Sequence, residues 1–130
     1  TKQEKKQHAK LLLSETTTMP PAFNLLVTLK FTEEQYLQQF LDFVKPLCDY
    51  IKEEEPETLA YEVIMSDQDP LQCMLFERYA DKENAFLKIH RSSKAFSDFR
   101  PKLKALQEAG HVQLDGHSYL DSMVGFINRS

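Results

Sequence analysis

The stretch TLAYEVIMSDQDPLQCMLFERYA, Thr58 to Ala80, decides the fold. Its two halves, 58–66 and 72–80, are rich in aliphatic and aromatic residues, which favour strands. The DQDP segment between them is typical of a turn, because aspartate and proline both stabilise turn backbones. The sequence therefore predicts two antiparallel strands joined as a hairpin.

On the N-terminal side of the hairpin, the residues predict a strand followed by a long helix. The strand is AFNLLVTLKF, residues 22–31, and the helix covers 33–54, with apolar residues recurring every three or four positions. Thr32 and Gln35 have the spacing of a capping box at its start. We expect Pro46 to kink or interrupt this helix, and the acidic residues at its C-terminal end to make that end fray.

On the C-terminal side, the residues predict two shorter helices and a fourth strand. Asp81 is placed to cap a helix that runs to His90, and Ser92 or Ser93 to cap the next one. Pro101 should bend the latter helix, and Gly110 fits the position just past its end. Residues 111–115 follow as a strand. The order β-α-β-β-α-β predicts an α+β protein with a ferredoxin-like antiparallel sheet.

The two faces of the hairpin lead to an expectation about assembly. If Ser66 pairs with Leu71, one face carries Leu59, Tyr61, Val63, Met65, Met74 and Phe76. The other face then carries Ala60, Ile64, Cys73, Leu75 and Tyr79, with Glu62 and Glu77 among them. A sheet with one face in water should alternate between apolar and polar residues. Because both faces are largely apolar, we expect a second copy of the chain to cover the face without helices, as a homodimer.

The domain organisation is simple. A chain of 130 residues forms one domain, which we place at residues 22–115. Residues 1–21 form an N-terminal extension, either a helical arm or a disordered segment. Residues 116–130 form a C-terminal extension, which is apolar enough to pack on the domain or on a dimer partner.

Composition excludes several classes of protein. The net charge of −4 argues against a nucleic-acid binder, which would show a basic patch. No run approaches the about 18 apolar residues that cross a bilayer, so we expect no contact with a membrane. The first ten residues are charged and do not form a secretory signal, and Cys48 and Cys73 make no disulfide framework. We therefore expect a cytoplasmic protein.

Residues 55–99 resemble the signature region of antibiotic biosynthesis monooxygenase (ABM) domains, and the resemblance extends over about residues 22–115. Its motifs are Glu55-Pro56, Leu59-x-Tyr61, Asp69-Pro70, Glu77-x-Tyr79-x-Asp81 and a helix ending in His90. The resemblance implies a dimeric α/β barrel, in which two ferredoxin-like sheets pack face to face. It also implies a monooxygenase that needs no cofactor and reacts a small aromatic substrate with molecular oxygen.

The resemblance implies roles for particular residues. His90 matches the family histidine and would take a proton from the substrate, and imidazole titrates nearest neutral pH. Tyr79 and Asn24 would orient the substrate. Tyr79 stands where the polyketide hydroxylases and haem-degrading members favour tryptophan, so a quinol or related aromatic substrate is the better match. The expected pocket-lining residues, each with a place in the core as its alternative, are Phe40, Phe76, Phe86 and Phe96.

Other interpretations stay open. The same fold and pocket would suit an isomerase or a non-catalytic dimer that binds a small molecule. The residues His111, Asp115, His117 and Asp121 match no standard zinc spacing, so we expect no metal site. Glu62 and Glu77 are expected on one face, either as an acid–base pair or in ion pairs with Arg78, Lys30 or a partner chain.

Overall fold

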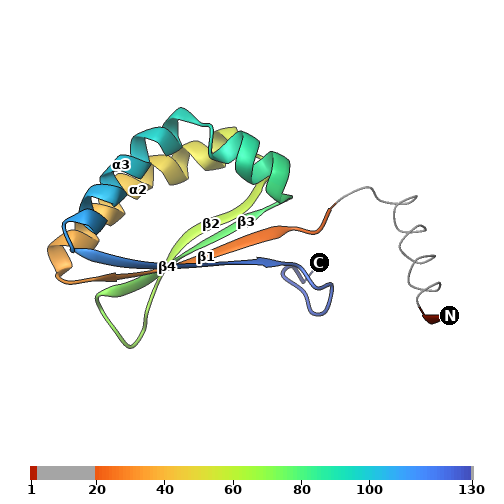
Figure 1. The fold of residues 1–130 in the computed structure, drawn as a ribbon, viewed down its shortest axis with the longest axis horizontal. Helices are drawn as coiled ribbons and strands as arrows, with labels where there is room; N and C mark the ends of the chain where they lie inside the picture. Colours follow the sequence, from red (N-terminus) through yellow and green to blue (C-terminus); the bar gives the residue numbers. More distant parts are fainter. Residues whose placement is uncertain (3–19, 130) are drawn as a thin grey trace.

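The computed structural model describes residues 1–2 and 20–129, which form one antiparallel sheet with helices on one face (Figure 1). The elements are β1 (Phe23–Phe31), α2 (Glu34–Glu54), β2 (Thr58–Met65), β3 (Gln72–Tyr79), η1 (Lys82–His90), α3 (Lys94–Glu108) and β4 (Val112–Leu120). The strand order is β2-β3-β1-β4, with every neighbouring pair antiparallel. This arrangement confirms the predicted ferredoxin-like α+β fold. Most of the expected N-terminal extension, 1–21, lies outside the described residues.

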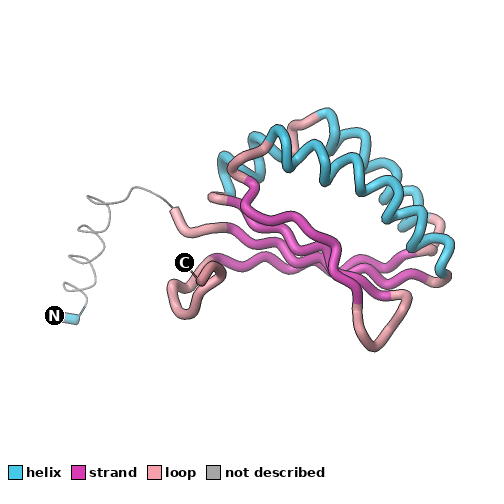
Figure 2. The backbone as a smooth tube through the Cα atoms, turned by 180° about the vertical axis from the view of Figure 1, so that it is seen from behind, coloured by secondary structure: helices cyan, strands magenta, loops and turns pink. Residues whose placement is uncertain are grey.

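The core lies between the sheet and the two long helices (Figure 2). In β1, alternate side chains point towards the helices, and Phe23, Leu29 and Phe31 are buried there. The apolar stripe of α2 packs against Leu29 and Phe31, and Phe40 at its centre is completely buried. Burying an aromatic side chain of this size stabilises the fold by about 2–3 kcal/mol. Side chains alternate with a period of two in the strand and repeat about every 3.6 residues in the helix. The apolar side chains of the two elements therefore gather on facing surfaces, and the helix covers one face of the sheet.

The prolines do not break the helices. Pro46 lies inside the continuous helix α2, and Pro101 lies inside α3. Each proline removes one backbone donor, but both lie on exposed surfaces, where water can satisfy the carbonyl that loses its partner. The expected interruption of the helix at Pro46 was therefore wrong, whereas the kink at Pro46 and the bend at Pro101 stay predictions.

The ends of α2 also differ from expectation. Glu33 is the N-cap residue and makes no side-chain capping bond, and the Thr32 hydroxyl donates to the His111 carbonyl at 3.5 Å. The predicted capping box is therefore absent. At the other end, the Glu55 N–H donates to the Ile51 carbonyl and the Glu55 side chain is buried, so this end is fixed by tertiary contacts and does not fray.

Side-chain caps begin the two later helices as predicted. The Asp81 carboxylate accepts from the N–H groups of Asn84 and Ala85, which starts η1, a helix with hydrogen bonds between residues five apart. The Ser93 hydroxyl accepts from the Phe96 N–H at the start of α3. Gly110 follows α3 with a φ of +78°, a backbone conformation that glycine adopts without steric cost.

The register of the hairpin differs by one residue from the expected pairing. The Ser66 N–H donates to the Gln72 carbonyl, and Met65 pairs with Cys73. A shift of one residue exchanges the faces of a strand. Tyr61 therefore shares the helix-covered face with Glu77, and Glu62 lies on the opposite face, so Glu62 and Glu77 are not the pair that the sequence suggested.

Strand β4 is longer than predicted. It pairs with β1 from Val112 to Leu120, so residues 116–120 of the expected C-terminal extension belong to the sheet. The chain then turns at Asp121, and several apolar side chains of the last segment are exposed, among them Met123 and Val124. We use the name outer face for the side of the sheet that carries no helix, which is the side of Asn24, Leu26, Phe76 and Arg78.

Candidate active site

A cavity of about 310 Å³ lies between the inner face of the sheet and the helices. Its wall is mainly apolar and includes residues from four strands, η1 and α3. The apolar and aromatic lining residues are Leu25, Val27, Leu29, Tyr61, Leu75, Phe86, Phe96, Phe99, Leu103 and Leu114. The remaining lining residues are Glu77, Arg91 and Arg100. This is the composition of a small-molecule site, in which apolar walls surround a few polar groups.

Glu77 is the acidic group on this wall. It lies on β3 in the alternating series Cys73, Leu75, Glu77 and Tyr79, all of which are buried against the helices. Its side chain is opposite Tyr61 of β2. Burial raises the pKa of Glu77 to about 7, and a hydrogen bond from Tyr79 opposes that rise. The carboxyl is therefore near its midpoint at neutral pH.

Tyr79 is completely buried, and its hydroxyl donates to Glu77 Oε1 at 2.5 Å. Burial and the neighbouring Glu77 charge raise the pKa of Tyr79, so it remains protonated and keeps this donor role. Its ring packs against Phe23, Phe86 and His90. Tyr79 therefore contacts Glu77 directly, although it is not itself a cavity-lining residue.

His90 lies at the C-terminal end of η1 and is 1% exposed. Its Nδ1 atom is 3.1 Å from Glu55 Oε1, and the Thr58 hydroxyl donates to the same oxygen at 3.1 Å. Burial, with a smaller contribution from Arg91, lowers the pKa of His90 to about 4, so its ring is neutral at pH 7. Burial also raises the pKa of Glu55.

Aromatic rings surround His90. Its ring centre is 4.9 Å from that of Phe96, 5.3 Å from Tyr79 and 5.4 Å from Tyr61. Tyr61 and Phe96 also line the cavity, whereas His90 does not. Within the described part of the chain, His90 Nε2 is buried and has no hydrogen-bond partner. His90 therefore lies next to the cavity, on the far side of rings that form its wall.

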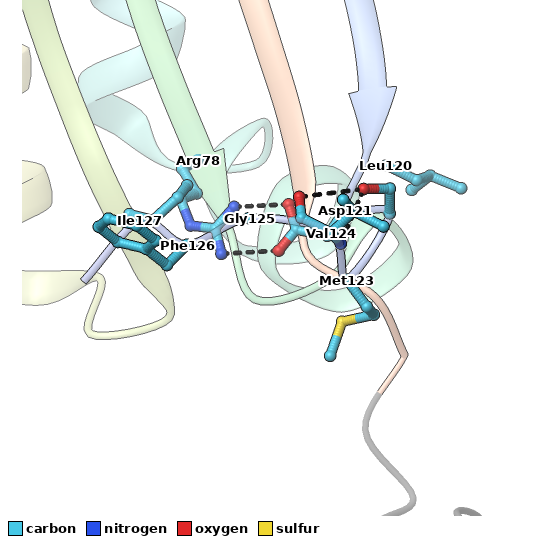
Figure 3. Close-up of a pocket in the computed structure, with 9 residues that line it drawn as sticks. Arg78, Leu120, Asp121, Met123, Val124, Gly125, Phe126 and Ile127 are labelled. Carbon is cyan, nitrogen blue, oxygen red and sulfur yellow. Dashed lines mark hydrogen bonds and ion pairs between the residues drawn. The ribbon is translucent and has the colours of Figure 1, made fainter. Parts of the chain in front are cut away.

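Asn24 lies elsewhere. It is on the outer face of β1, where its side-chain oxygen accepts from Arg78 at 3.0 Å and its amide donates to Asp121 at 2.9 Å. Arg78 in turn makes two hydrogen bonds to the Asp121 carboxylate, at 2.7 and 2.8 Å (Figure 3). The structure thus brings Tyr79 and His90 together but places Asn24 on the other side of the sheet. The Asn24–Arg78–Asp121 cluster satisfies the polar groups of Asn24 without a ligand.

The segment after Asp121 forms a second hollow next to this cluster. It measures about 450 Å³ and is lined by Arg78 and by residues 120–127. In Figure 3 the side chains of Leu120 and Met123 point away from the ion pair. Among the described residues that line this hollow, the charged ones are Arg78 and Asp121, which are already paired with each other.

The four expected pocket phenylalanines divide into three groups. Phe86 and Phe96 line the cavity. Phe40, on α2, is completely buried in the core and does not line the cavity. Phe76 is on the outer face, opposite Leu26 of β1. The alternation within β3 puts Phe76 on the face opposite to the buried Leu75 and Glu77, whatever the register of the hairpin.

Among the described residues, no group of three or more histidine, cysteine, aspartate or glutamate side chains is arranged to hold a metal ion. His111 stacks on Tyr36, Asp121 binds Arg78, and Asp115 contacts His117 at 3.2 Å. Across residues 1–2 and 20–129, no helix is long and apolar enough to cross a membrane.

Sequence reasoning passed over Glu55 as a site residue, and it singled out Glu77 only as a partner of Glu62. The signal for Glu77 was present, because the alternation in β3 puts it in series with buried residues. Glu55 offered no such signal. It follows a run of acidic residues at a helix end, and only the tertiary structure places it against His90.

Known proteins share this fold. A candidate antibiotic biosynthesis monooxygenase from Bacteroides thetaiotaomicron superposes with a TM-score of 0.66 at 18% identity, over 84% of this chain and 97% of its own. A second candidate, from Caulobacter crescentus, gives 0.62 at 19% identity, over 83% and 97%. The cofactor-independent oxygenase SnoaB from Streptomyces nogalater gives 0.62 at 8% identity, over 81% and 97%.

These identities are low, so the superpositions establish the fold and nothing beyond it. A search of curated proteins gives no match. The model of the family described as antibiotic biosynthesis monooxygenase matches residues 23–102, from the start of β1 into α3. The match covers more than half of the chain and confirms the resemblance read from the motifs: the chain belongs to the antibiotic biosynthesis monooxygenase family.

Proposed function

We propose that the protein is a cofactor-independent monooxygenase that binds a small hydroxylated aromatic, such as a quinol, in the cavity between sheet and helices. The observation that carries this proposal is the cavity itself, which combines an apolar and aromatic wall with one buried carboxyl, Glu77. A volume of about 310 Å³ is at the lower end of the range for ligand pockets, which suits one or two aromatic rings.

The chemistry requires an electron-rich substrate and a group that removes its proton. The aromatic anion then transfers electrons to molecular oxygen, and a carbon–oxygen bond forms to give a peroxide. Loss of water from the peroxide leaves a carbonyl group, so one oxygen atom enters the product and the other leaves as water. The protein supplies an apolar cavity, a base and an oriented hydrogen bond.

The sequence suggested His90 as the base, with Tyr79 and Asn24 as orienting groups, and this assignment stays a prediction. In favour of His90 are its neutral ring at pH 7 and its unpartnered Nε2 atom. Its position behind Tyr61 and Phe96 requires a ring movement before it could contact a ligand.

We also propose that two copies of the chain pair through the outer face. Leu26, Met74 and Phe76 are only partly buried there, and Ile64 is 44% exposed. These side chains lie on neighbouring strands, since Leu26 pairs with Phe76 and Ile64 pairs with Met74. A second copy would bury this patch by a two-fold contact between identical surfaces.

Oxygen uptake with a panel of hydroquinones and anthrones tests the reaction. We expect uptake with at least one substrate, and we expect isotopically labelled O₂ to place one labelled atom in the product. Val27→Phe fills the cavity and should abolish uptake, whereas Val124→Phe, on an exposed segment, should leave it unchanged. A product of unchanged mass formed without oxygen would support an isomerase. A bound but unaltered aromatic would support a binding protein.

A further inference from the structure

Glu77 is the one acidic residue among the described residues that line the cavity. The same wall contains no histidine, and its tyrosine, Tyr61, keeps its proton because burial holds its pKa well above the usual value. A ligand in the cavity therefore meets one group that is able to accept a proton. Glu77 is 5% exposed, so its carboxyl faces the cavity and not bulk water.

The two oxygens of Glu77 have different surroundings. Oε1 accepts the Tyr79 hydroxyl at 2.5 Å, and this bond fixes the orientation of the carboxylate. No described residue donates a hydrogen bond to Oε2. A carboxylate oxygen has two lone pairs, so Oε2 is open to a donor from a ligand. The hydroxyl of a phenol or quinol is such a donor.

The charged and titratable groups around Glu77 do not neutralise it. Tyr61 faces it from β2, Tyr79 lies on its own strand, and the Glu77 charge is one of the smaller causes that raise the pKa of the Cys48 thiol on α2. Arg91 and Arg100 line the same cavity, but neither makes an ion pair with Glu77. Among the described residues the buried carboxyl thus has no counter-ion, and burial raises its pKa to about 7.

We propose that Glu77, oriented by the Tyr79 hydroxyl, is the catalytic base that binds and accepts the proton of the substrate hydroxyl, and that His90 is a structural partner of Glu55. This inference rests on the proposed function. The base touches the substrate through Oε2, whereas Tyr79 acts through Glu77 and is a positioning residue.

The proton balance is simple. The substrate O–H bond breaks, its proton forms an O–H bond to Glu77 Oε2, and the electron pair stays on the aromatic ring. That anion reduces molecular oxygen, and a carbon–oxygen bond forms at a ring carbon that carries a hydrogen, which gives a peroxide anion. The C–H and O–O bonds of the peroxide then break, so a carbonyl group forms and the outer oxygen leaves with that hydrogen as hydroxide. The protonated Glu77 gives its proton to the hydroxide, which gives water and restores the carboxylate. A carboxyl that titrates near neutral pH serves both steps, since it neither holds nor releases the proton too strongly.

The pH dependence of kcat/KM separates the two candidate bases. A base must be deprotonated to act, so with Glu77 the wild-type kcat/KM should rise with pH through about 7 and level off above it. With His90 as base, the rise would come at about 4. Glu77→Gln should lower kcat/KM by about 100-fold or more and abolish the rise. Glu83→Gln, the same change on an exposed residue of η1, is the matched control.

Two further variants complete the series. Tyr79→Phe removes the donor that opposes the rise in the pKa of Glu77, so the rise in kcat/KM should move to higher pH. If Tyr79 had only a structural role, Tyr79→Phe would lower kcat/KM without changing the pH at which kcat/KM rises. His90→Gln should leave the position of the rise unchanged. Circular dichroism checks that each variant is folded, and Glu77→Met replaces Glu77→Gln if the latter is not.

A binding measurement keeps the inference testable whether or not oxygen is consumed. Calorimetry compares hydroquinone with its dimethyl ether, which cannot donate a hydrogen bond. The wild type should prefer hydroquinone, the preference should grow as the pH rises through about 7, and Glu77→Gln should lose that growth. This result without any oxygen uptake would support the role of Glu77 and overturn the monooxygenase proposal.

Two outcomes would overturn the inference. One is oxygen uptake that Glu77→Gln retains within about three-fold, with His90→Gln losing the pH dependence. That result would leave the monooxygenase proposal standing with His90 as its base. The other is a wild type that binds hydroquinone and its ether equally at every pH, or binds neither.

Discussion

Two neighbouring residues of β3, Glu77 and Arg78, belong to opposite faces of the sheet and have opposite electrostatic surroundings. Glu77 points under the helices and has no cationic partner in the part of the chain that the structure describes, and burial raises its pKa to about 7. Arg78 points to the outer face and holds the Asp121 carboxylate by two hydrogen bonds. Those bonds, with one from Asn24, lower the pKa of Asp121 to about 2.

The difference shows how one strand holds one carboxyl-bearing side chain that titrates near neutral pH and one arginine that fixes a carboxylate in its charged form. A carboxylate with paired donors is held in its charged form across the physiological range, so it contributes structure but cannot exchange protons. A carboxyl buried without a counter-ion changes its charge near neutral pH, at a cost to stability. We therefore place the chemistry on the inner face and the contact with a second copy on the outer face.

The largest expected effect is on assembly through the outer face. Phe76→Lys puts a charge in the middle of the apolar patch, next to Leu26, and burying an unpaired ammonium group there is strongly unfavourable. We expect the wild type to be a dimer at micromolar concentration and the variant to be a monomer, as measured by light scattering.

Tyr50→Lys is the control for this change, because Tyr50 is an exposed aromatic residue on helix α2, on the other side of the molecule. It should leave the dimer intact. A wild type that remains monomeric at these concentrations would contradict the proposed contact and leave the outer face without an assigned partner.

The second largest expected effect is the pH dependence of the free energy of unfolding that arises from the charge of Glu77. Its pKa is raised from 4.5 to about 7 in the folded protein. The folded state therefore holds its proton more tightly than the unfolded state, and the wild type should lose stability as the pH rises from 4.5 to about 7. At about 1.4 kcal/mol per pKa unit, the loss is about 3 kcal/mol.

Glu77→Gln has no such charge, so it should be more stable than the wild type by up to about 3 kcal/mol at about pH 8, with little difference near pH 4. Unfolding by denaturant at both pH values measures the difference in the free energy of unfolding. Glu83→Gln should be no more stable than the wild type at either pH. A loss of stability at pH 8 on replacing Glu77 would mean that the carboxylate is well solvated in the folded state, which contradicts its description as an uncompensated charge.

Much of the fold could be predicted from local patterns. The alternation in β1 and β3 and the apolar stripe of α2 placed the strands and the helix to within one or two residues, because both periods are set by backbone geometry. The capping bonds of Asp81 and Ser93 were also predictable, since each is made within four residues.

The site was less predictable because it depends on contacts between distant segments. His90 and Tyr79 were selected through the family motif, and the structure places them in ring contact. Asn24 was selected as a polar residue in an apolar strand, and its partners, Arg78 and Asp121, are 54 and 97 residues away along the chain. The hairpin register, which separates Glu77 from Glu62, depends on the turn between Ser66 and Gln72 and was wrong by one residue.

The smallest effect concerns the paired charge of the outer face. Asp121→Asn keeps the shape of the side chain but removes the charge that holds Arg78. The Arg78 and Asp121 side chains are 14% and 26% exposed, so water screens part of their attraction. We expect a loss of about 1 kcal/mol in the free energy of unfolding at neutral pH.

The pH dependence of this loss should be opposite in sense to that at Glu77. The depressed pKa of Asp121 stabilises the folded state above 3.8, and that contribution disappears as the pH falls through about 2. Wild type and Asp121→Asn should therefore converge in strongly acidic solution. Asp67→Asn, in the exposed turn between β2 and β3, should match the wild type throughout. If Asp121→Asn and the wild type were equally stable at neutral pH, the ion pair between Arg78 and Asp121 would contribute nothing to the free energy of unfolding. Of the two carboxyl groups, only Glu77 would then make stability depend on charge.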